Sequence, residues 1–278
     1  MTESGQSTTP AEPRSRTDAD VRAGFRVAIT DGVALLTIDR PKANAIDAAT
    51  SVAMGQAFLA FEADPTVRVA IVTGEGERFF SAGWDLSAAG EGEAFDSDYG
   101  AGGFGGFVDL ANRTVPVIAA VNGMAVGGGF EIAMAADFLI AADHAQFFLP
   151  EASLGILPDA GSVRLPRMLP PHVAREVLYA GRRLSAADVE RFGIANRVVP
   201  GSDLLVAATE LALRIAASAP LSVAAIMDIE RCTASLDPIE AMLFIKGLPS
   251  YRACIDSDDA NEGTAAFAER RSPIWSGR

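Results

Sequence analysis

The chain has few of the residues that build metal sites or disulfide frameworks. It contains only two cysteines and two histidines among its 278 residues. Cys232 and Cys254 lie 22 positions apart in the C-terminal third and form no Cys-x-x-Cys pair. Neither a zinc site nor a disulfide framework fits so few ligands at such spacing. We therefore expect no bound metal, and a location in the reducing cytoplasm.

Positive charge is also scarce. The chain has 23 Lys and Arg residues against 36 Asp and Glu residues, which gives a net charge of −13 and a sequence pI near 4.6. Proteins that bind nucleic acid gather basic side chains against the phosphate backbone, and this sequence shows no such cluster. The charge balance therefore predicts no nucleic-acid partner.

Signals for export or for a membrane span are missing from the sequence as well. Residues 1–22 contain no apolar stretch, and their acidic residues do not fit a transit peptide, so we predict a disordered tail there. Residues 117–142 are apolar enough to suggest a transmembrane helix, but they include two acids and three consecutive glycines. We therefore expect no membrane partner.

The apolar pattern predicts strands that alternate with helices. Asp31-Gly32 is a dipeptide favoured in two-residue hairpins, and Asp47 is placed to cap a helix that runs to about Phe61. Another helix is expected from Gly128 onward. This alternation is typical of an α/β core with parallel strands, here over residues 23–200. The predicted strands are 25–30, 33–39, 67–74, 117–121, 137–142 and 145–149.

Beyond Gly161 the pattern becomes helical. Ser185 followed by Asp188 resembles a capping box, and apolar residues recur every three or four positions between 204 and 215. We predict helices at 165–168, 173–179 and 185–192, followed by a helical C-terminal region over 201–278. The stretch 87–106, rich in glycine, alanine and acids, is predicted to be a mobile loop.

Three consecutive glycines, Gly127-Gly128-Gly129, follow a predicted strand and precede a predicted helix. Backbone N–H groups at a helix N-terminus have no partner within the helix, and glycine lets a ligand approach them closely. The triplet therefore predicts an anion or oxyanion site, although a tight structural turn has the same pattern. It has neither the Gly-Lys-Ser/Thr of a phosphate loop nor the spacing of a dinucleotide motif.

The motif SAGWDL, residues 81–86, is a second turn that follows a strand and contains glycine. The N–H of Trp84 is placed to be a second donor, and two donors from separate loops stabilise a developing enolate or tetrahedral oxygen. A tryptophan at such a position is also common in a protein core. The sequence alone leaves both interpretations open.

Glu131 and Glu151 stand in largely apolar surroundings. A buried carboxylate is costly unless it is paired or its pKa rises, and two such groups in one pocket suit general acid and base catalysis. The structural alternatives are a helix cap for Glu131 and an exposed loop acid for Glu151. Spacing along the chain does not bring the two side chains together.

The segments VNGMAVGGGFEIAMAADFLIAA, AQFFLPEASLGILPDAG and FFSAGWDL resemble the crotonase (enoyl-CoA hydratase/isomerase) superfamily, and the similarity extends from about Phe25 to the end. The resemblance implies a crotonase-like α/β core of repeated ββα units. It also implies a helical C-terminal region that forms a homotrimer or a dimer of trimers. The implied substrate is an acyl-CoA thioester, with no cofactor beyond the coenzyme A that is part of it.

The resemblance also implies roles for individual residues. The thioester oxygen would be held by the N–H groups of Trp84 and Gly128. Glu131 and Glu151 correspond to the two catalytic glutamates, with Glu131 as the base that activates water and Glu151 as the proton donor. The residues alone do not separate these two roles. Further substrate contacts are implied for Ala45, Ala82, Gly83, Asp85, Leu86, Gly127, Pro150 and Asp159.

Other segments, among them RPKANAIDAATS, AGRRLSAADVERFGIANRVV and SPIWSGR, resemble the carnitinyl-CoA dehydratase branch of this superfamily. The substrate of that branch carries a trimethylammonium group, which aromatic faces and a nearby carboxylate bind well. The aromatic residues also fit the anchoring of a lid or of a trimer contact. The predicted cage consists of Trp84, Tyr99, Phe104, Phe107 and Asp159.

Three alternatives remain within the superfamily. General enoyl-CoA hydratases usually have glycine at the position of Asp159. Dienoyl-CoA isomerases have an acid eight residues after the second catalytic residue, as Asp159 follows Glu151, but aspartate in place of Glu131. RNA-binding members are expected to have basic patches, which the charge of −13 does not favour.

Overall fold

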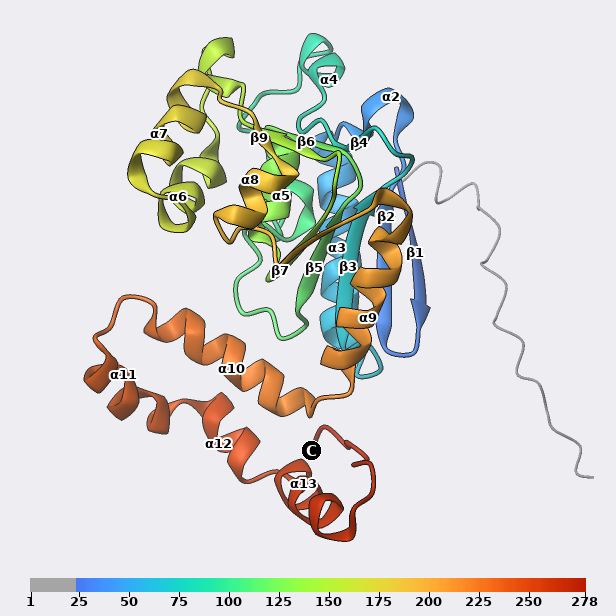
Figure 1. Ribbon diagram of the computed structural model, residues 1–278, viewed down its shortest axis with the longest axis vertical. Helices are drawn as coiled ribbons and strands as arrows, with labels where there is room; N and C mark the ends of the chain where they lie inside the picture. Colours follow the sequence, from blue (N-terminus) through green and yellow to red (C-terminus); the bar gives the residue numbers. More distant parts are fainter. Residues whose placement is uncertain (1–23) are drawn as a thin grey trace, which may run out of the picture.

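A computed structural model describes residues 24–278. The predicted disordered tail, residues 1–22, lies outside the described residues. Two sheets with helices packed on them form the upper part of the molecule in Figure 1, and further helices form the lower part. The predicted α/β class with parallel strands is confirmed.

The larger sheet has six strands in the order β1-β2-β3-β5-β7-β10. All neighbouring pairs are parallel except β1 and β2, which form the predicted hairpin. Asp31 and Gly32 both have positive φ, 52° and 79°, as a two-residue hairpin turn requires. The strands are β1 Phe25–Thr30, β2 Val33–Ile38, β3 Val69–Gly74, β5 Val117–Val121, β7 Phe138–Ala142 and β10 Arg197–Val199.

The smaller sheet has the order β4-β6-β8-β9, with β4, β6 and β8 parallel. The chain alternates between the sheets, because β3, β5 and β7 of the larger sheet lead into β4, β6 and β8 of the smaller one. A helix follows each of these pairs, which gives the expected repeated ββα units. The strands are β4 Phe79–Ser81, β6 Met124–Val126, β8 Gln146–Phe148 and β9 Leu184–Ser185.

Two helices begin at the capping groups that the sequence predicts. Asp47 accepts a hydrogen bond from the N–H of Thr50, and Ser185 and Asp188 form the predicted reciprocal capping box. The helices are α2 Pro41–Asn44, α3 Ala48–Ala63, α4 Leu86–Gly90, α5 Gly128–Ala135, α6 Asp159–Met168, α7 Pro171–Ala180, α8 Ala186–Arg191, α9 Leu204–Ala216, α10 Pro220–Thr233, α11 Pro238–Phe244, α12 Pro249–Ile255 and α13 Asp258–Glu269.

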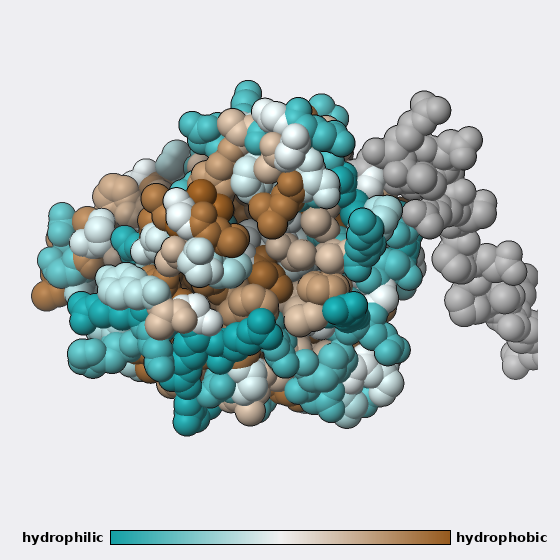
Figure 2. Space-filling view, turned by 90° about the horizontal axis from the view of Figure 1, so that it is seen from above, coloured by the Kyte–Doolittle hydropathy of each residue, from teal (hydrophilic) through white to brown (hydrophobic). Residues whose placement is uncertain are grey.

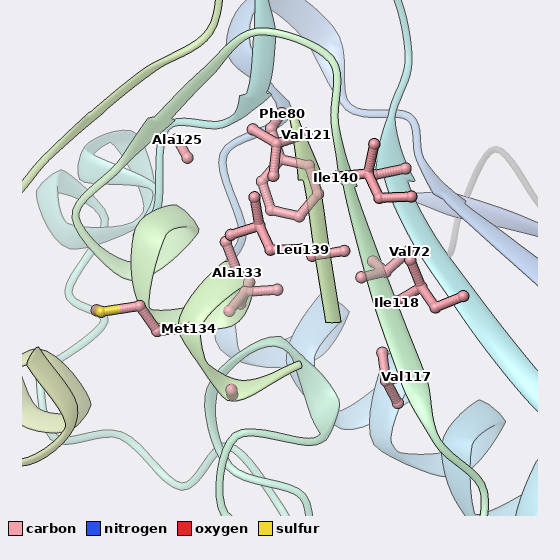
Figure 3. Close-up of a cluster of buried hydrophobic side chains, with 14 of the residues drawn as sticks. Val72, Phe80, Val117, Ile118, Val121, Ala125, Ala133, Met134, Leu139 and Ile140 are labelled. Atoms are coloured by element: carbon pink, nitrogen blue, oxygen red, sulfur yellow. The ribbon is translucent and has the colours of Figure 1, made fainter. Parts of the chain in front are cut away.

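The core joins the larger sheet to α5. Side chains of Ile118, Val121 and Ile140 from β5 and β7 lie in one cluster with Phe80 and Ala133 (Figure 3). Burying one large apolar side chain stabilises the fold by about 1.5–3 kcal/mol, so this cluster holds α5 firmly against both sheets. The helix that follows the three glycines is therefore a rigid element.

The C-terminal helices differ in their packing. Helix α9 lies across β2, β3, β5 and β7 and buries Ala207, Ala208 and Ala212. Helices α10–α13 form the lower part of the molecule in Figure 1 and expose large apolar side chains. Within residues 24–278 no single helix is long and apolar enough to cross a membrane. Only the helix pair 201–216 and 220–233 together has the length and apolar composition of a membrane span, and the two helices are bent by 101° relative to each other.

Three local expectations differ from the structure. The strands β4, β6, β9 and β10 were not among the predicted ranges, since each has only two or three residues and stands outside a longer apolar run. Helix α6 begins at Asp159, well before the predicted 165, since the acid in its first turn suits the helix dipole. The stretch predicted as a mobile loop contains α4 and a short 3-10 turn at Phe104–Gly106.

Candidate active site

The connections that follow β4, β6 and β8 meet at one edge of the smaller sheet. Because these strands are parallel neighbours, their carboxyl ends lie side by side, the usual place for a ligand in such folds. Trp84, Gly128 and Glu151 follow the three strands in turn and line one cavity of about 230 Å³. On the face shown in Figure 2, hydrophobic residues gather near the centre around a hollow.

Most of the residues predicted to form the site line this cavity. Three do not: Ala45, Gly83 and Asp85. The carbonyl of Gly83 accepts a hydrogen bond from Ile46, and Asp85 caps α4 and pairs with Arg40 at 3.0 Å, so both support the loop from behind. The predicted residues that do line the cavity are Ala82, Trp84, Leu86, Gly127, Gly128, Glu131, Pro150, Glu151 and Asp159.

The N–H groups of Trp84 and Gly128 are both free to bind a substrate. Trp84 forms a parallel bridge with Ile46, in which the flanking Gly83 carbonyl and Asp85 N–H bond to Ile46, so its own N–H points to the other side. Gly128 is the first residue of α5, where amides have no partner within the helix. Neither N–H donates to another group in the described part of the chain.

The two loops that carry these amides are in direct contact. A Cβ on Gly83 would lie 2.7 Å from both the nitrogen of Gly128 and the carbonyl oxygen of Val126, which is impossible without movement. Gly83 also has a φ of +79°. Glycine is therefore required at position 83 to bring the loop after β4 against the start of α5.

Glu131 lies in the first turn of α5 and is almost fully buried. Its Oε1 accepts a hydrogen bond of 2.8 Å from the N–H of Gly161. Burial raises the pKa of this carboxyl to about 7, and the neighbouring acids Glu151 and Asp159 act in the same direction. The bond from Gly161 opposes this rise, because it stabilises the ionised form.

Glu151 follows Pro150 just beyond β8 and is buried as well, so it is not the exposed loop acid of the structural alternative. Burial raises its pKa to about 7. Its Oε2 is buried and has no hydrogen-bond partner within residues 24–278. A Cβ on Gly127 would lie 2.5 Å from its Oε1, so the glycine makes room for this carboxyl.

Four aromatic side chains form one wall of the cavity: Trp84, Phe95, Tyr99 and Phe104. They pack edge to face in two pairs, Trp84 with Phe95 at 5.5 Å and Tyr99 with Phe104 at 5.4 Å between ring centroids. Burial and nearby acids raise the pKa of Tyr99 to about 12, so its hydroxyl is neutral at pH 7.

Phe107 was expected in the cage, and the structure corrects this prediction. Its side chain is 1% exposed and packs on Phe58 at 4.6 Å between ring centroids, inside the core. Phe95, which the sequence analysis did not single out, takes a place in the wall instead. The sequence carried no signal to separate the two phenylalanines, because both lie in a stretch without regular periodicity.

The charged groups of the cavity are all acids. Asp109, Glu131, Glu151 and Asp159 line it, and none of its described lining residues is Lys, Arg or His. Asp109 was also missed in the sequence analysis. In the described chain, moreover, no group of three or more His, Cys, Asp or Glu side chains is arranged to hold a metal ion. A cavity of aromatic faces and carboxyls without a basic group suits a cationic ligand.

Comparison with known proteins agrees with this geometry. Residues 28–278 match the enoyl-CoA hydratase/isomerase family. A carnitinyl-CoA dehydratase from Salmonella typhi is 55% identical over 246 residues, which cover 87% of this chain and 94% of that protein. A second, from Salmonella enteritidis, matches equally well. The crystal structure of an enoyl-CoA hydratase from Mycobacterium tuberculosis superposes with a TM-score of 0.85 at 36% identity, over 92% of this chain and 100% of that one.

These matches place the chain in a class of enzymes with the crotonase fold, the hydro-lyases that act on enoyl-CoA thioesters. The chain belongs to the enoyl-CoA hydratase/isomerase family. The expected fold and family are thereby confirmed.

Proposed function

We propose that this enzyme adds water reversibly across the α,β double bond of crotonobetainyl-CoA to give carnitinyl-CoA. The observation that carries the proposal is the meeting of Glu131, Glu151 and two free backbone amides in one cavity with an aromatic, acidic wall. The similarity to carnitinyl-CoA dehydratases at 55% identity supports the choice of substrate.

The two amides stabilise the charge that develops during the reaction. When hydroxide adds to Cβ, the electrons of the double bond move toward the thioester carbonyl and leave an enolate oxygen. The N–H groups of Trp84 and Gly128 come from separate loops and donate to this oxygen, and Gly128 adds the positive end of the α5 dipole. Such donors act more strongly on the enolate than on the ground-state carbonyl.

The two glutamates exchange protons with the water and with Cα. Glu131 receives a hydrogen bond from Gly161, which favours its ionised form, so it is the base that takes a proton from water. Glu151 has an oxygen buried without a partner among the described residues, which favours its neutral form, so it donates the proton to Cα. The pKa of each is raised to about 7, which suits both roles near neutral pH.

The wall of the cavity selects the acyl group. Crotonobetaine carries a trimethylammonium group one carbon beyond the carbon that gains the hydroxyl. This group has no hydrogen to donate, so it is bound by aromatic faces and by carboxylates at a distance. Each cation–π contact contributes roughly 0.5–2 kcal/mol. Trp84, Tyr99 and Phe104 offer such faces, and Asp159 offers the charge.

The remaining assignments follow from the family resemblance. Ala45, Gly83 and Asp85 stand outside the cavity. We assign Ala45 to contacts with the coenzyme A part of the substrate, and Gly83 and Asp85 to support of the loop that carries the Trp84 amide. The reaction uses only groups of the protein and the substrate, so we propose no further cofactor. The apolar side chains exposed on α10–α13 are suited to contacts between copies in a trimer or a dimer of trimers. We propose a cytoplasmic enzyme.

A substrate comparison tests the proposal. Initial rates of hydration are measured for crotonobetainyl-CoA, crotonyl-CoA and 5,5-dimethylhex-2-enoyl-CoA, in which a carbon replaces the ammonium nitrogen. The last compound is the matched control, since it has the same shape without the charge. We expect kcat/KM to be at least tenfold higher for crotonobetainyl-CoA than for either neutral substrate. Equal or faster turnover of crotonyl-CoA would contradict the substrate assignment and favour a general enoyl-CoA hydratase.

A further inference from the structure

A carboxylate outside the catalytic pair joins two separate elements beside the cavity. Glu93 accepts a hydrogen bond of 2.7 Å from the indole Nε1 of Trp84. The same carboxylate accepts the backbone N–H of Ala48, at 3.2 Å to Oε1 and 3.1 Å to Oε2. Glu93 therefore ties the loop after β4 to the start of α3.

The α3 end of this connection suits a negative charge. Ala48 is the first residue of a helix of sixteen residues, where N–H groups have no partner within the helix and the helix dipole is positive. Asp47 already accepts from Thr50, so Glu93 takes a second of these free donors. The connection thus stabilises α3 and fixes the position of the Glu93 carboxylate at the same time.

The other end fixes a residue of the candidate site. The indole of Trp84 is held by Glu93 through its nitrogen and by the edge-to-face contact with Phe95. Tyr99 donates its hydroxyl to the carbonyl of Phe95, which extends the connected set along the aromatic wall. The backbone of Trp84 provides one of the two free amides. Movement of the indole would therefore displace an aromatic face of the cavity wall, while the backbone amide stays held by the bridge to Ile46.

We propose that Glu93 is a positioning residue of the active site. It acts through Trp84, because it holds the indole in place as part of the aromatic wall. The role of this wall in binding the acyl group rests on the proposed function. Glu93 does not line the cavity, so it acts on the reaction without touching the substrate.

Kinetics of matched variants test the role. Glu93→Ala is expected to lower kcat/KM about tenfold to hundredfold, because small displacements of a positioned group have effects of that size. Glu93→Gln keeps an oxygen that accepts from the Trp84 indole, so it should recover most of this loss. Glu91→Ala is the control, since Glu91 is exposed in the same segment and its side chain makes no hydrogen bond in the described structure. Equal activity of Glu93→Ala and Glu91→Ala would overturn the proposal.

Trp84→Phe removes the indole N–H but keeps an aromatic ring and the backbone amide. If Glu93 acts through this indole, the double variant Glu93→Ala/Trp84→Phe loses no more activity than the more impaired single variant. Losses that multiply would show that Glu93 acts by another route. Because Trp84→Phe and Glu93→Gln are conservative, they also test the proposal if Glu93→Ala fails to fold.

Tryptophan fluorescence provides a readout that needs no substrate. The chain has two tryptophans, Trp84 and Trp275, and Trp275 lies outside the cavity. In a Trp275→Phe background the emission comes from Trp84 alone. Glu93→Ala should increase quenching of this emission by acrylamide, whereas Glu91→Ala should not. Unchanged quenching would overturn the proposal, while failure of the unmodified enzyme to hydrate any enoyl-CoA would overturn the proposed function instead.

Discussion

The backbone N–H of Gly161 donates a hydrogen bond of 2.8 Å to Oε1 of Glu131. Gly161 lies in the first turn of α6, where this N–H has no partner within the helix and the dipole favours a negative charge. Oε2 of Glu151 has no such donor among residues 24–278. Burial raises the pKa of both glutamates, but only Glu131 has a hydrogen-bond donor at the start of α6 that stabilises its ionised form.

Replacing either glutamate is expected to remove most of the activity. Glu131→Gln and Glu151→Gln should each lower kcat about 10²- to 10⁴-fold, the usual effect of losing a general acid or base. Glu77→Gln is a suitable control, because Glu77 is exposed and lies outside the cavity. Steady-state hydration assays measure these effects. Near-normal turnover by either variant would exclude that residue from proton transfer.

The hydration rate should depend on pH in a bell shape centred near pH 7. In the proposed mechanism the active form has Glu131 ionised and Glu151 protonated, and the pKa of each is raised to about 7. Activity therefore rises with pH as the first proton leaves the pair and falls as the second leaves. Measurement of kcat/KM between pH 5 and 9 tests this. A rate that stays flat across that range would argue against the pair.

Burial of Glu151 is expected to make the fold less stable at high pH. Its pKa in the folded state, about 7, lies above the ordinary 4.5, so the folded state binds this proton more tightly. The stability that this proton contributes is fully present below pH 4.5 and is lost as the pH rises through 7. Glu151→Gln should match the unmodified enzyme in melting temperature at pH 4.5 and exceed it by a few degrees at pH 8. A lower melting temperature of the variant at pH 8 would contradict this.

A comparison of Gly127→Ala with Gly76→Ala separates the effect of backbone strain from the effect of displacing the Glu151 carboxyl. Gly127 has a φ of +55°, and a Cβ there would meet Oε1 of Glu151 at 2.5 Å. Gly76 has a φ of +82°, but a Cβ on it would meet no atom within 4 Å, so Gly76→Ala adds strain alone. Gly76→Ala should lose about 1–2 kcal/mol of stability, and Gly127→Ala at least as much because of the added clash. Only Gly127→Ala should also lose activity, about a hundredfold, and equal activities would refute the argument.

Asp159→Asn should raise KM for the charged substrate only. Removing this carboxylate weakens the attraction for the trimethylammonium group, so we expect KM for crotonobetainyl-CoA to rise about threefold to thirtyfold. KM for crotonyl-CoA should not change, because that acyl group carries no charge. Steady-state kinetics with both thioesters measure the difference. A similar change for both substrates would give Asp159 a structural role instead.

Sequence patterns predicted those elements that are determined by residues close together in the chain. The Asp31-Gly32 hairpin, the Asp47 cap and the Ser185–Asp188 capping box are each determined by residues within a few positions of one another. The family resemblance supplied the residues at the site. Both kinds of inference located the loops that carry Trp84 and Gly128, and the structure brings these loops into contact.

The contacts across the site were not predictable from local pattern. Glu131 and Glu151 meet because β7 and β8 return the chain to the same edge of the smaller sheet, which spacing does not show. Phe95 and Asp109 were missed because their stretch has no periodicity and is ordered by distant partners such as Trp84. Phe107 was misplaced for the same reason, since its contact with Phe58 of α3 joins distant parts of the chain.

The alternation of the chain between two sheets has a consequence for how such enzymes diversify. In the proposed mechanism, three successive units contribute four groups just past the ends of their second strands: an amide at Trp84, an amide at Gly128 together with a base at Glu131, and an acid at Glu151. The strands themselves are fixed by the core. A new reaction can therefore arise by exchanging the groups of one unit while those of the other two units stay in use.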